Sequence, residues 1–456
     1  MALSPDNQFH NVSLSGLYGF SDGSRLSGTV AMGRMQQDEV FLPYSSVFSA
    51  ASPLPALSLQ GDVRTLNASL NYATRLASRL SLRARYTADV RDNDTRRHLY
   101  QRIPGDSAAQ AALVSSNTRL NRPYSHGKQQ IALDSVLRLS GARQLQLSYQ
   151  YDLKHRDFVA VDSVNEQSLG LKFRFPLPGA GSASVELQEA ARRGSAYKSN
   201  EGFLNGHNPD FIATLSGNEL FENDPLLRRF HLADRNRSRT SVMLNTIFPA
   251  GLSLNINGNL TRDEFPGSLI GLQSSDAWHL DVNLGYSPAD RLNLNVYRGW
   301  QAYRNDQAGY ERSNRTPFYP ASERLQNNNW YMSSLDKVHS SGASINWTSM
   351  NDRWEIRSDV SISDAGTQSR PASPGLDFTA LPDFKTRFAT FNTAIKYTFT
   401  GGNGVTVRYR YDDYHSSDFA LDNVAVDSLN NILLLGNASP VYSGSMLELR
   451  FTTMLP

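Results

Sequence analysis

Residues 80–91 read Leu-Ser-Leu-Arg-Ala-Arg-Tyr-Thr-Ala-Asp-Val-Arg, and in this stretch apolar residues alternate strictly with polar ones. A period of two residues is typical of a β-strand with one apolar face and one polar face. The same alternation occurs at 144–154, 252–261 and 405–412, and no long window shows a helical period with caps at both ends. The sequence therefore predicts an all-β chain with two-faced strands.

The length of these segments favours strands that cross a membrane. Soluble strands are usually about 5–6 residues long, whereas a tilted membrane strand needs about 9–11. The hydrophobic fraction is 39% and the mean hydropathy is −0.44, so no stretch approaches the ~20 apolar residues of a membrane helix. The 10% aromatic content suits the interfacial girdles of a barrel. We therefore predict a single antiparallel transmembrane β-barrel domain over residues 1–456, set in outer-membrane lipid.

Connections of two lengths separate the predicted strands. The short ones carry the Gly, Pro, Asn, Asp and Ser expected of tight turns, and most of the connections between them are long. Short turns on one side and long loops on the other are the outer-membrane arrangement, with the long loops outside the cell. We expect short turns at 21–24, 75–79, 140–143, 176–181, 249–251, 287–291, 349–353 and 400–404, long connections at 36–60, 92–125, 194–232, 303–335, 364–384 and 415–440, and two shorter ones at 158–161 and 264–275.

The pattern yields about 17 strands, from one near 11–20 to one near 444–453. The last strand would end on the short-turn side, which places the C-terminus in the periplasm. The first would start on the long-loop side, although single-chain bacterial barrels have an even strand number. The first ten residues also lack the basic and apolar regions of a signal peptide, so the sequence is either a mature form or a fragment that begins inside the gene. We therefore expect a chain that lacks the N-terminal strands of a larger barrel.

Composition also limits the possible chemistry. The absence of cysteine excludes disulfides, thiolate catalysis, iron–sulfur ligation and covalent haem attachment in this segment. A net charge of +2 gives no reason to expect nucleic acid. The nine histidines are scattered, and neither His155 near Asp157 nor His415 near Ser416 and Asp418 makes a convincing triad. We expect no enzymatic activity and no cofactor bound by the chain itself.

The predicted loop 415–440 and its junction with the preceding strand carry two further signals. An acidic cluster at the junction could supply oxygen ligands to Ca²⁺, and it consists of Asp412, Asp413, Asp418 and Asp422. The cluster lacks the spacing of an EF-hand, so a solvated loop is the simpler interpretation. The apolar run 432–435 could pack into the barrel mouth or contact a partner, and packing is the favoured interpretation.

Several stretches resemble the MtrB/PioB family, the decahaem-associated outer-membrane barrels of bacterial extracellular electron transfer. They read ALSPDNQ at 2–8, RLSGTVAMGRMQQDEVFLPYS at 25–45 and LSLRARYTADVRDN at 80–93. The clearest is RYRYDDYHSSDFALDNVAVDSLNNILLLGNASPVY at 408–442. Two departures are the missing C-x-x-C of the family's N-terminus and an ending in Pro456 where barrels usually end in an aromatic residue.

The resemblance implies a barrel, of about 26 strands in this family, that encloses a periplasmic multihaem (decahaem) cytochrome. That cytochrome carries the haem and passes electrons across the membrane, to an outer-surface multihaem cytochrome or another acceptor. A general or substrate-specific diffusion porin shares every feature read from the residues alone, and an outer-membrane hydrolase is disfavoured. In either barrel the polar positions should face a wet lumen, and in the sheath they would face the cytochrome. The candidates are Arg83, Arg85, Asp89, Gln146, Gln150, Lys172, Arg174, Asn255, Asn257, Asp281, Glu355, Arg357, Arg408 and Arg410.

Overall fold

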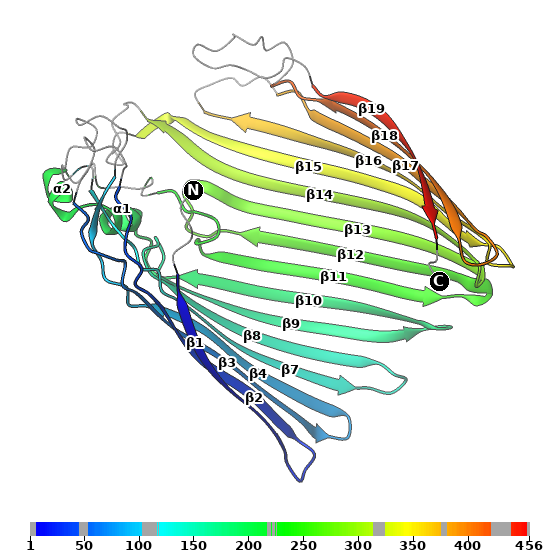
Figure 1. Cartoon of the computed structure of the whole chain (residues 1–456), viewed down its shortest axis with the longest axis horizontal. Coiled ribbons are helices and arrows are strands. Elements are labelled where there is room, and N and C mark those ends of the chain that lie inside the picture. Colours follow the sequence, from blue (N-terminus) through cyan, green and yellow to red (C-terminus); the bar gives the residue numbers. More distant parts are fainter. Residues whose placement is uncertain are drawn as a thin grey trace.

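The computed structural model describes residues 6–44, 53–102, 116, 118–216, 220, 224, 226–312, 324–374, 381–420 and 439–453. Within these residues the chain forms one 17-stranded antiparallel sheet, which confirms the predicted all-β class and strand count (Figure 1). The strands of this sheet are β1 (Gln8–Gly19), β2 (Arg25–Gln37), β3 (Gly61–Ala77), β4 (Leu80–Asn93), β7 (His126–Arg138), β8 (Gln144–Arg156), β9 (Ser163–Leu177), β10 (Gly181–Gly194), β11 (Arg235–Ile247), β12 (Leu252–Glu264), β13 (Gly271–Ala289), β14 (Leu292–Arg312), β15 (Arg324–Thr348), β16 (Trp354–Ala372), β17 (Phe384–Thr398), β18 (Gly404–Ser417) and β19 (Val441–Thr452).

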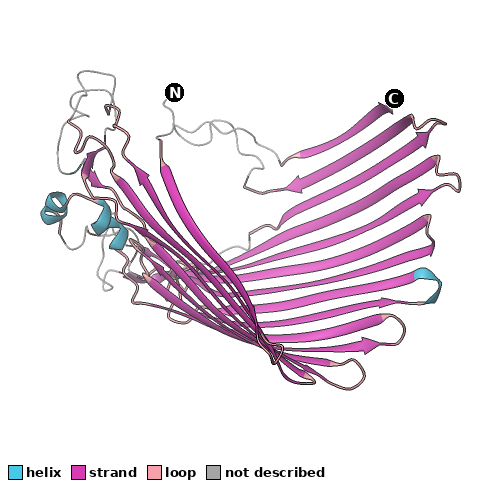
Figure 2. Cartoon of the chain, turned by 60° about the horizontal axis from the view of Figure 1, so that its bottom comes forward, coloured by secondary structure: helices cyan, strands magenta, loops and turns pink. Residues whose placement is uncertain are grey.

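Each strand of the sheet pairs with the next one along the chain. The one skip joins β4 to β7, because β5 (Leu99–Gln101) and β6 (Thr118–Leu120) form a separate two-stranded ribbon in the connection between them. The sheet is strongly curved, like the wall of a barrel, and β1 and β19 form its two edges (Figure 2). Among the described residues these two edges are not paired with each other.

The predicted alternation of short and long connections is largely confirmed. Tight turns stand at all eight expected places, including the 3₁₀ turn η4 (Pro249–Gly251) between β11 and β12. The connection from β10 to β11 holds two short helices, α1 (Glu201–Gly206) and α2 (Pro209–Thr214). Within the described residues, no helix combines the length and the apolar character that a bilayer crossing requires.

Three predicted connections were partly wrong, because strands continue into them. β13 begins at Gly271, inside the expected connection 264–275. β14 runs on to Arg312 and β15 begins at Arg324, so most of the expected loop 303–335 is paired strand. β16 likewise continues to Ala372, inside the expected loop 364–384. Hydrophobic alternation marks a strand only where one face is apolar. Here both faces become polar while the backbone pairing continues, so the sequence pattern ends before the strand does.

The register sorts side chains onto two faces, because residues directly opposite each other on antiparallel strands point to the same side. One of these, the apolar face, carries Ile256 of β12 opposite Leu244 of β11 and Val282 of β13. Its side chains are unusually open to the surroundings: Leu187, Leu260 and Val296 are 51%, 54% and 55% exposed. Such a continuous exposed apolar surface does not occur on a soluble monomer and fits contact with lipid.

The apolar face forms a belt whose height matches a bilayer. On β4 it runs from Leu80 to Val90, which at ~3.3 Å per residue and a tilt near 40° gives a height of about 25 Å. Aromatic rings gather at its short-turn edge, where the rings of Tyr18 and Phe20 pack edge to face with their centroids 4.7 Å apart. At the same edge, the ring centroids of Trp354 and Tyr397 lie 4.7 Å apart. Such girdles mark a membrane interface.

The turn between β11 and β12 packs closely against the turn that follows β13, and this contact can be tested. Gly251 has a φ of +79°, and a Cβ there would lie 2.0 Å from the Ser287 carbonyl oxygen. A non-glycine residue with a positive φ costs about 1–2 kcal/mol in backbone strain. Gly251→Ala should lower the free energy of unfolding in urea by more than this, because the clash with Ser287 is added to the strain. Gly141→Ala is the matched control, because that turn glycine has a φ of +66° and open space around it. Equal losses for both variants would show that the contact with Ser287 is unimportant.

Candidate functional site: the polar face of the sheet

All fourteen predicted site residues lie on the face opposite the apolar belt, here called the polar face. The register shows this strand by strand: Arg83 pairs with Asp134, and Asp281 pairs with Asn257. Arg357 lies opposite Ala394, which in turn lies opposite Arg408. A period of two was therefore sufficient to place residues from seven different strands on one surface. That this surface lines a lumen stays a prediction.

Several charged groups of this face pair with a side chain on the neighbouring strand, and others pair with a side chain two residues away on the same strand. Lys172 contacts Glu186 at 3.0 Å, and Arg408 contacts Glu448 at 3.0 Å. The result is a hydrogen-bonding surface on which basic side chains pair with carboxylates. Other contacts of the predicted residues are Arg85 with Asn71 at 3.2 Å, Gln146 with Asp134 at 3.5 Å, Gln150 with Asp152 at 2.5 Å, Arg174 with Ser182 at 3.3 Å, Arg410 with Asp412 at 2.8 Å, and the ion pair of Glu355 with Arg357.

The polar face is hollowed where β2, β3, β4, β7 and β8 meet near their short turns. A hollow of about 720 Å³ is lined there by Arg25, Arg83, Asp134 and Gln146, among others. Side chains from five consecutive strands can surround one space only where the surface that carries them is concave. The polar face is therefore concave in this region, which is the geometry that a lumen requires.

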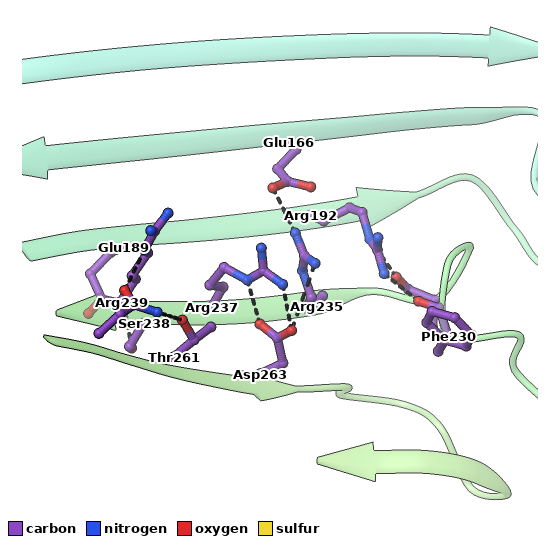
Figure 3. A network of polar contacts seen from close by, with 12 residues as sticks. Glu166, Glu189, Arg192, Phe230, Arg235, Arg237, Ser238, Arg239, Thr261 and Asp263 are labelled. Atoms are coloured by element: carbon purple, nitrogen blue, oxygen red, sulfur yellow. Dashed lines mark hydrogen bonds and ion pairs between the residues drawn. The ribbon is translucent and has the colours of Figure 1, made fainter. Parts of the chain in front are cut away.

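A charged network at the long-connection end of the polar face was not among the predicted residues. Asp263 of β12 accepts two hydrogen bonds of 2.7 Å from the Arg237 guanidinium of β11 (Figure 3). Arg235 bridges Glu166 of β9 at 2.9 Å and Asp263 at 3.9 Å. The local sequence held one signal, since Arg235, Arg237 and Arg239 alternate in a strand. Their carboxylate partners, 69 and 26 residues away, are not visible in a local pattern.

The network is well shielded from solvent and anchors the connection that follows β10. The Asp263 and Arg235 side chains are only 12% and 14% exposed. Arg192 of β10 stands opposite Arg235 and donates to the carbonyl oxygens of Ala233 at 2.9 Å and Phe230 at 2.5 Å. Glu166 and Asp263 thus offset the repulsion among the arginines, while Arg192 ties residues 230–233 to the rim of the sheet.

The two short helices of this connection pack around an imidazole. The His207 ring stacks on Phe203 with centroids 3.9 Å apart, and its Nδ1 lies 2.9 Å from the Phe203 carbonyl oxygen. Burial lowers the pKa of His207 from its ordinary 6.5, and the positive charges of Arg119 and Arg122 lower it further.

This lowered pKa predicts a pH-dependent loop. A depressed pKa means that the fold favours neutral His207, so its stabilisation is present above pH 6.5 and is lost as the pH falls below that value. Limited proteolysis of the connection between β10 and β11 should therefore be faster at pH 5.5 than at pH 7.5. His207→Gln, which cannot be protonated, should reduce the difference. Any remainder would come from His231 of the same connection, because burial lowers the pKa of that imidazole as well. An unchanged pH dependence in that variant would assign the effect to another group.

The remaining sequence candidates do not assemble into a site. His155 Nε2 lies 3.3 Å from Asp157 in an exposed pair, and His415 contacts Asp413 at 3.5 Å. Asp412 and Asp413, as neighbours in a strand, point to opposite faces, while Asp422 and the apolar run 432–435 lie outside the described residues. Within the part of the chain that the structure describes, no group of three or more His, Asp or Glu is placed to hold a metal ion.

The curved antiparallel sheet, the apolar belt of about 25 Å with its aromatic edge and the polar opposite face define an outer-membrane β-barrel protein. The family model described as "Putative outer membrane beta-barrel porin, MtrB/PioB" matches residues 1–455, so the chain belongs to this family. This confirms the resemblance drawn from the sequence. The family is one of barrel proteins and not of enzymes, and membership places the chain in the outer membrane.

Among curated proteins, the chain is 24% identical over 452 residues to "Outer membrane protein MtrB" of Shewanella baltica (strain OS185). The match covers 98% of this chain and 59% of that protein, so the chain spans about three fifths of its relative's length. Solved structures offer only distant likeness. The siderophore receptor PirA from Acinetobacter baumannii gives a TM-score of 0.40 at 10% identity, and the match covers 99% of this chain and 74% of the receptor. The outer membrane transporter YddB from Escherichia coli gives a TM-score of 0.37 at 9% identity, and the match covers 98% of this chain and 75% of the transporter.

Proposed function

We propose that the chain is part of a barrel that encloses a periplasmic multihaem c-type cytochrome and so forms an electron conduit across the outer membrane. The single observation that carries this proposal is the family match over residues 1–455. The cytochrome would carry all the haem, and an outer-surface multihaem cytochrome would be a possible second partner. The chain itself would supply insulation, position and a route through the lipid.

The two faces of the sheet support this role physically. A cytochrome cannot cross lipid unshielded, because every polar backbone group in a bilayer needs an internal partner, which a barrel wall provides. The polar face would then meet the cytochrome with hydrogen-bonding groups that are already paired, such as Lys172 with Glu186. Such a surface can exchange water-mediated contacts with a partner without leaving a buried charge unpaired.

We also propose that the long connections face the cell exterior and that the C-terminus is periplasmic. The belt lies near the short turns, while β14 and β15, of 21 and 25 residues, extend far past it on the other side. In outer-membrane barrels the periplasmic turns are short and the strands and loops extend on the outer side.

The test is to purify the full-length protein from outer membranes in mild detergent and to stain the preparation for covalent haem. A multihaem cytochrome at a constant ratio to the barrel is the expected result. A haem-free barrel that conducts ions freely in planar bilayers would contradict the sheath and identify a diffusion porin instead. The chain contains no cysteine, so any covalent haem detected must belong to a partner or to sequence outside these 456 residues.

A further inference from the structure

A hollow also occurs on the apolar face, at the edge of the belt that faces the long connections. It has a volume of about 580 Å³ and is lined by Trp278, Arg304, Lys337 and His339, among others. These residues come from β13, β14 and β15, which lie side by side in the sheet (Figure 1). We call this hollow the interfacial slot.

The slot arises from an alternation of large and small side chains across the strands. Trp278 lies opposite Ala302, and Ala302 lies opposite Lys337. Ala302 is only 7% exposed, so the long side chains on either side rise above it as walls. The pattern continues with Gly366 opposite Lys337 and Lys385 opposite Gly366. The register therefore builds a groove flanked by cations on the surface that faces lipid.

The position of the slot relates it to the membrane boundary. Toward the short turns the next residue of β14 on this face is Trp300, which stands opposite the lining residue His339. Arg298 follows, with its guanidinium carbon 5.5 Å from the centre of the Trp300 ring, and then the apolar belt, which on β14 consists of Leu292, Leu294 and Val296. Toward the long connections the slot is bounded by Arg304, and the apolar face becomes polar. Tryptophan marks the level of the lipid headgroups, so the slot lies where a headgroup meets the protein.

The cations of the slot are available to a ligand. Among the described residues neither the Arg304 guanidinium nor the Lys337 ammonium has an ion-pair partner, and both residues are exposed. Asp276 also lines the slot and stands directly opposite Arg304, but Arg262 of β12 lies 3.8 Å from its carboxylate and offsets its charge. Within the described part of the chain, the buried Nδ1 of His339 has no hydrogen-bond partner. An exposed arginine and lysine beside one carboxylate that Arg262 already offsets, at a membrane interface, form a surface that attracts anionic headgroups.

We propose that the interfacial slot binds a phosphate group of the phosphorylated glycolipid that forms the outer leaflet of the outer membrane. Arg304 and Lys337 bind the phosphate, Trp278 and Trp300 contact the sugar and the start of the acyl chains, and the aliphatic belt below receives those chains. The proposal rests on the outward orientation of the long connections proposed above. It does not depend on the cytochrome, so haem content and lipid binding are separate readouts.

The test uses the full-length protein in nanodiscs of phosphatidylcholine that contain bisphosphorylated lipid A, dephosphorylated lipid A or phosphatidylglycerol. After detergent extraction, mass spectrometry counts the lipid molecules retained per protein. Bisphosphorylated lipid A should be retained at least about tenfold over its dephosphorylated form, and the double variant R304E/K337E should reduce this retention about tenfold. The conservative double variant R304K/K337R should keep most of it.

The matched control is the double variant K128E/K154E, which reverses two lysines that stand opposite each other on the polar face. It changes the total charge by the same amount and should leave lipid retention unchanged. Equal retention of all three lipids, or an equal loss in both double variants, would overturn the proposal. Preferential retention of phosphatidylglycerol would also overturn it, because the slot would then face the inner leaflet. Heat-modified mobility on a gel confirms that each variant is folded before the lipids are counted.

Discussion

Replacing Ile256 by arginine is expected to lower the free energy of unfolding by about 2–4 kcal/mol. Ile256 lies in the middle of the apolar belt on β12, opposite Leu244 and Val282. An arginine there must either lose its hydration in the bilayer or bend toward an interface, and near the midplane both are costly. The effect is measured by urea unfolding of the protein folded into lipid vesicles, with tryptophan fluorescence as the signal.

The control is the next residue along the strand. Asn257→Arg places the same side chain on the polar face, beside Asp281. It should change the free energy of unfolding by no more than about 0.5 kcal/mol, as is usual for a solvated surface position. The two variants share backbone environment and strand propensity, so their difference reports on which face meets lipid. A larger loss for Asn257→Arg than for Ile256→Arg would invert the assignment of the faces.

Asp263→Ala is expected to cost about 3 kcal/mol, because it leaves the shielded guanidinium groups of Arg235 and Arg237 without their shared carboxylate. Only Glu166 would remain to balance Arg192, Arg235 and Arg237 at the rim of the sheet. We expect the residues that Arg192 ties down, 230–233, to become more accessible as well. Hydrogen exchange of this segment, together with urea unfolding, measures both effects.

Glu264→Ala serves as the comparison for that variant. Glu264 neighbours Asp263 and forms a 3.2 Å ion pair with Arg262, but it is 55% exposed and lies on the other face. Removing an exposed pair usually costs at most about 1 kcal/mol. Similar losses in both variants would mean that the charged network contributes no more than an ordinary surface ion pair, and that the rim is held by backbone pairing alone.

The sequence predicted the faces of the sheet better than its extent. Local alternation was enough for residues such as Arg83 and Asn257, because a strand's period of two does not depend on distant partners. The turns were predictable for the same reason, since glycine and proline act locally. The register across the strands then had little freedom, because a slip by one residue would expose the apolar side chains to the wrong surroundings.

What the sequence did not show depends on contacts between distant segments. The extension of β14 and β15 beyond the belt has no hydrophobic alternation, because both of its faces are polar. The strands continue there through the hydrogen bonds between them. The network around Asp263 joins strands that are far apart in the chain. The interfacial slot requires Ala302 to stand between Trp278 and Lys337, which only the register establishes.

The most direct test of the central claim is electron transfer across a sealed membrane. The full-length protein, purified with whatever partner it retains, is incorporated into vesicles that hold a reduced, membrane-impermeant dye, and a particulate acceptor too large to enter any pore is added outside. Oxidation of the enclosed dye without leakage of a small enclosed marker would agree with a barrel closed by a cytochrome. Leakage of the marker without oxidation of the dye by the particles would contradict the conduit and leave an open porin.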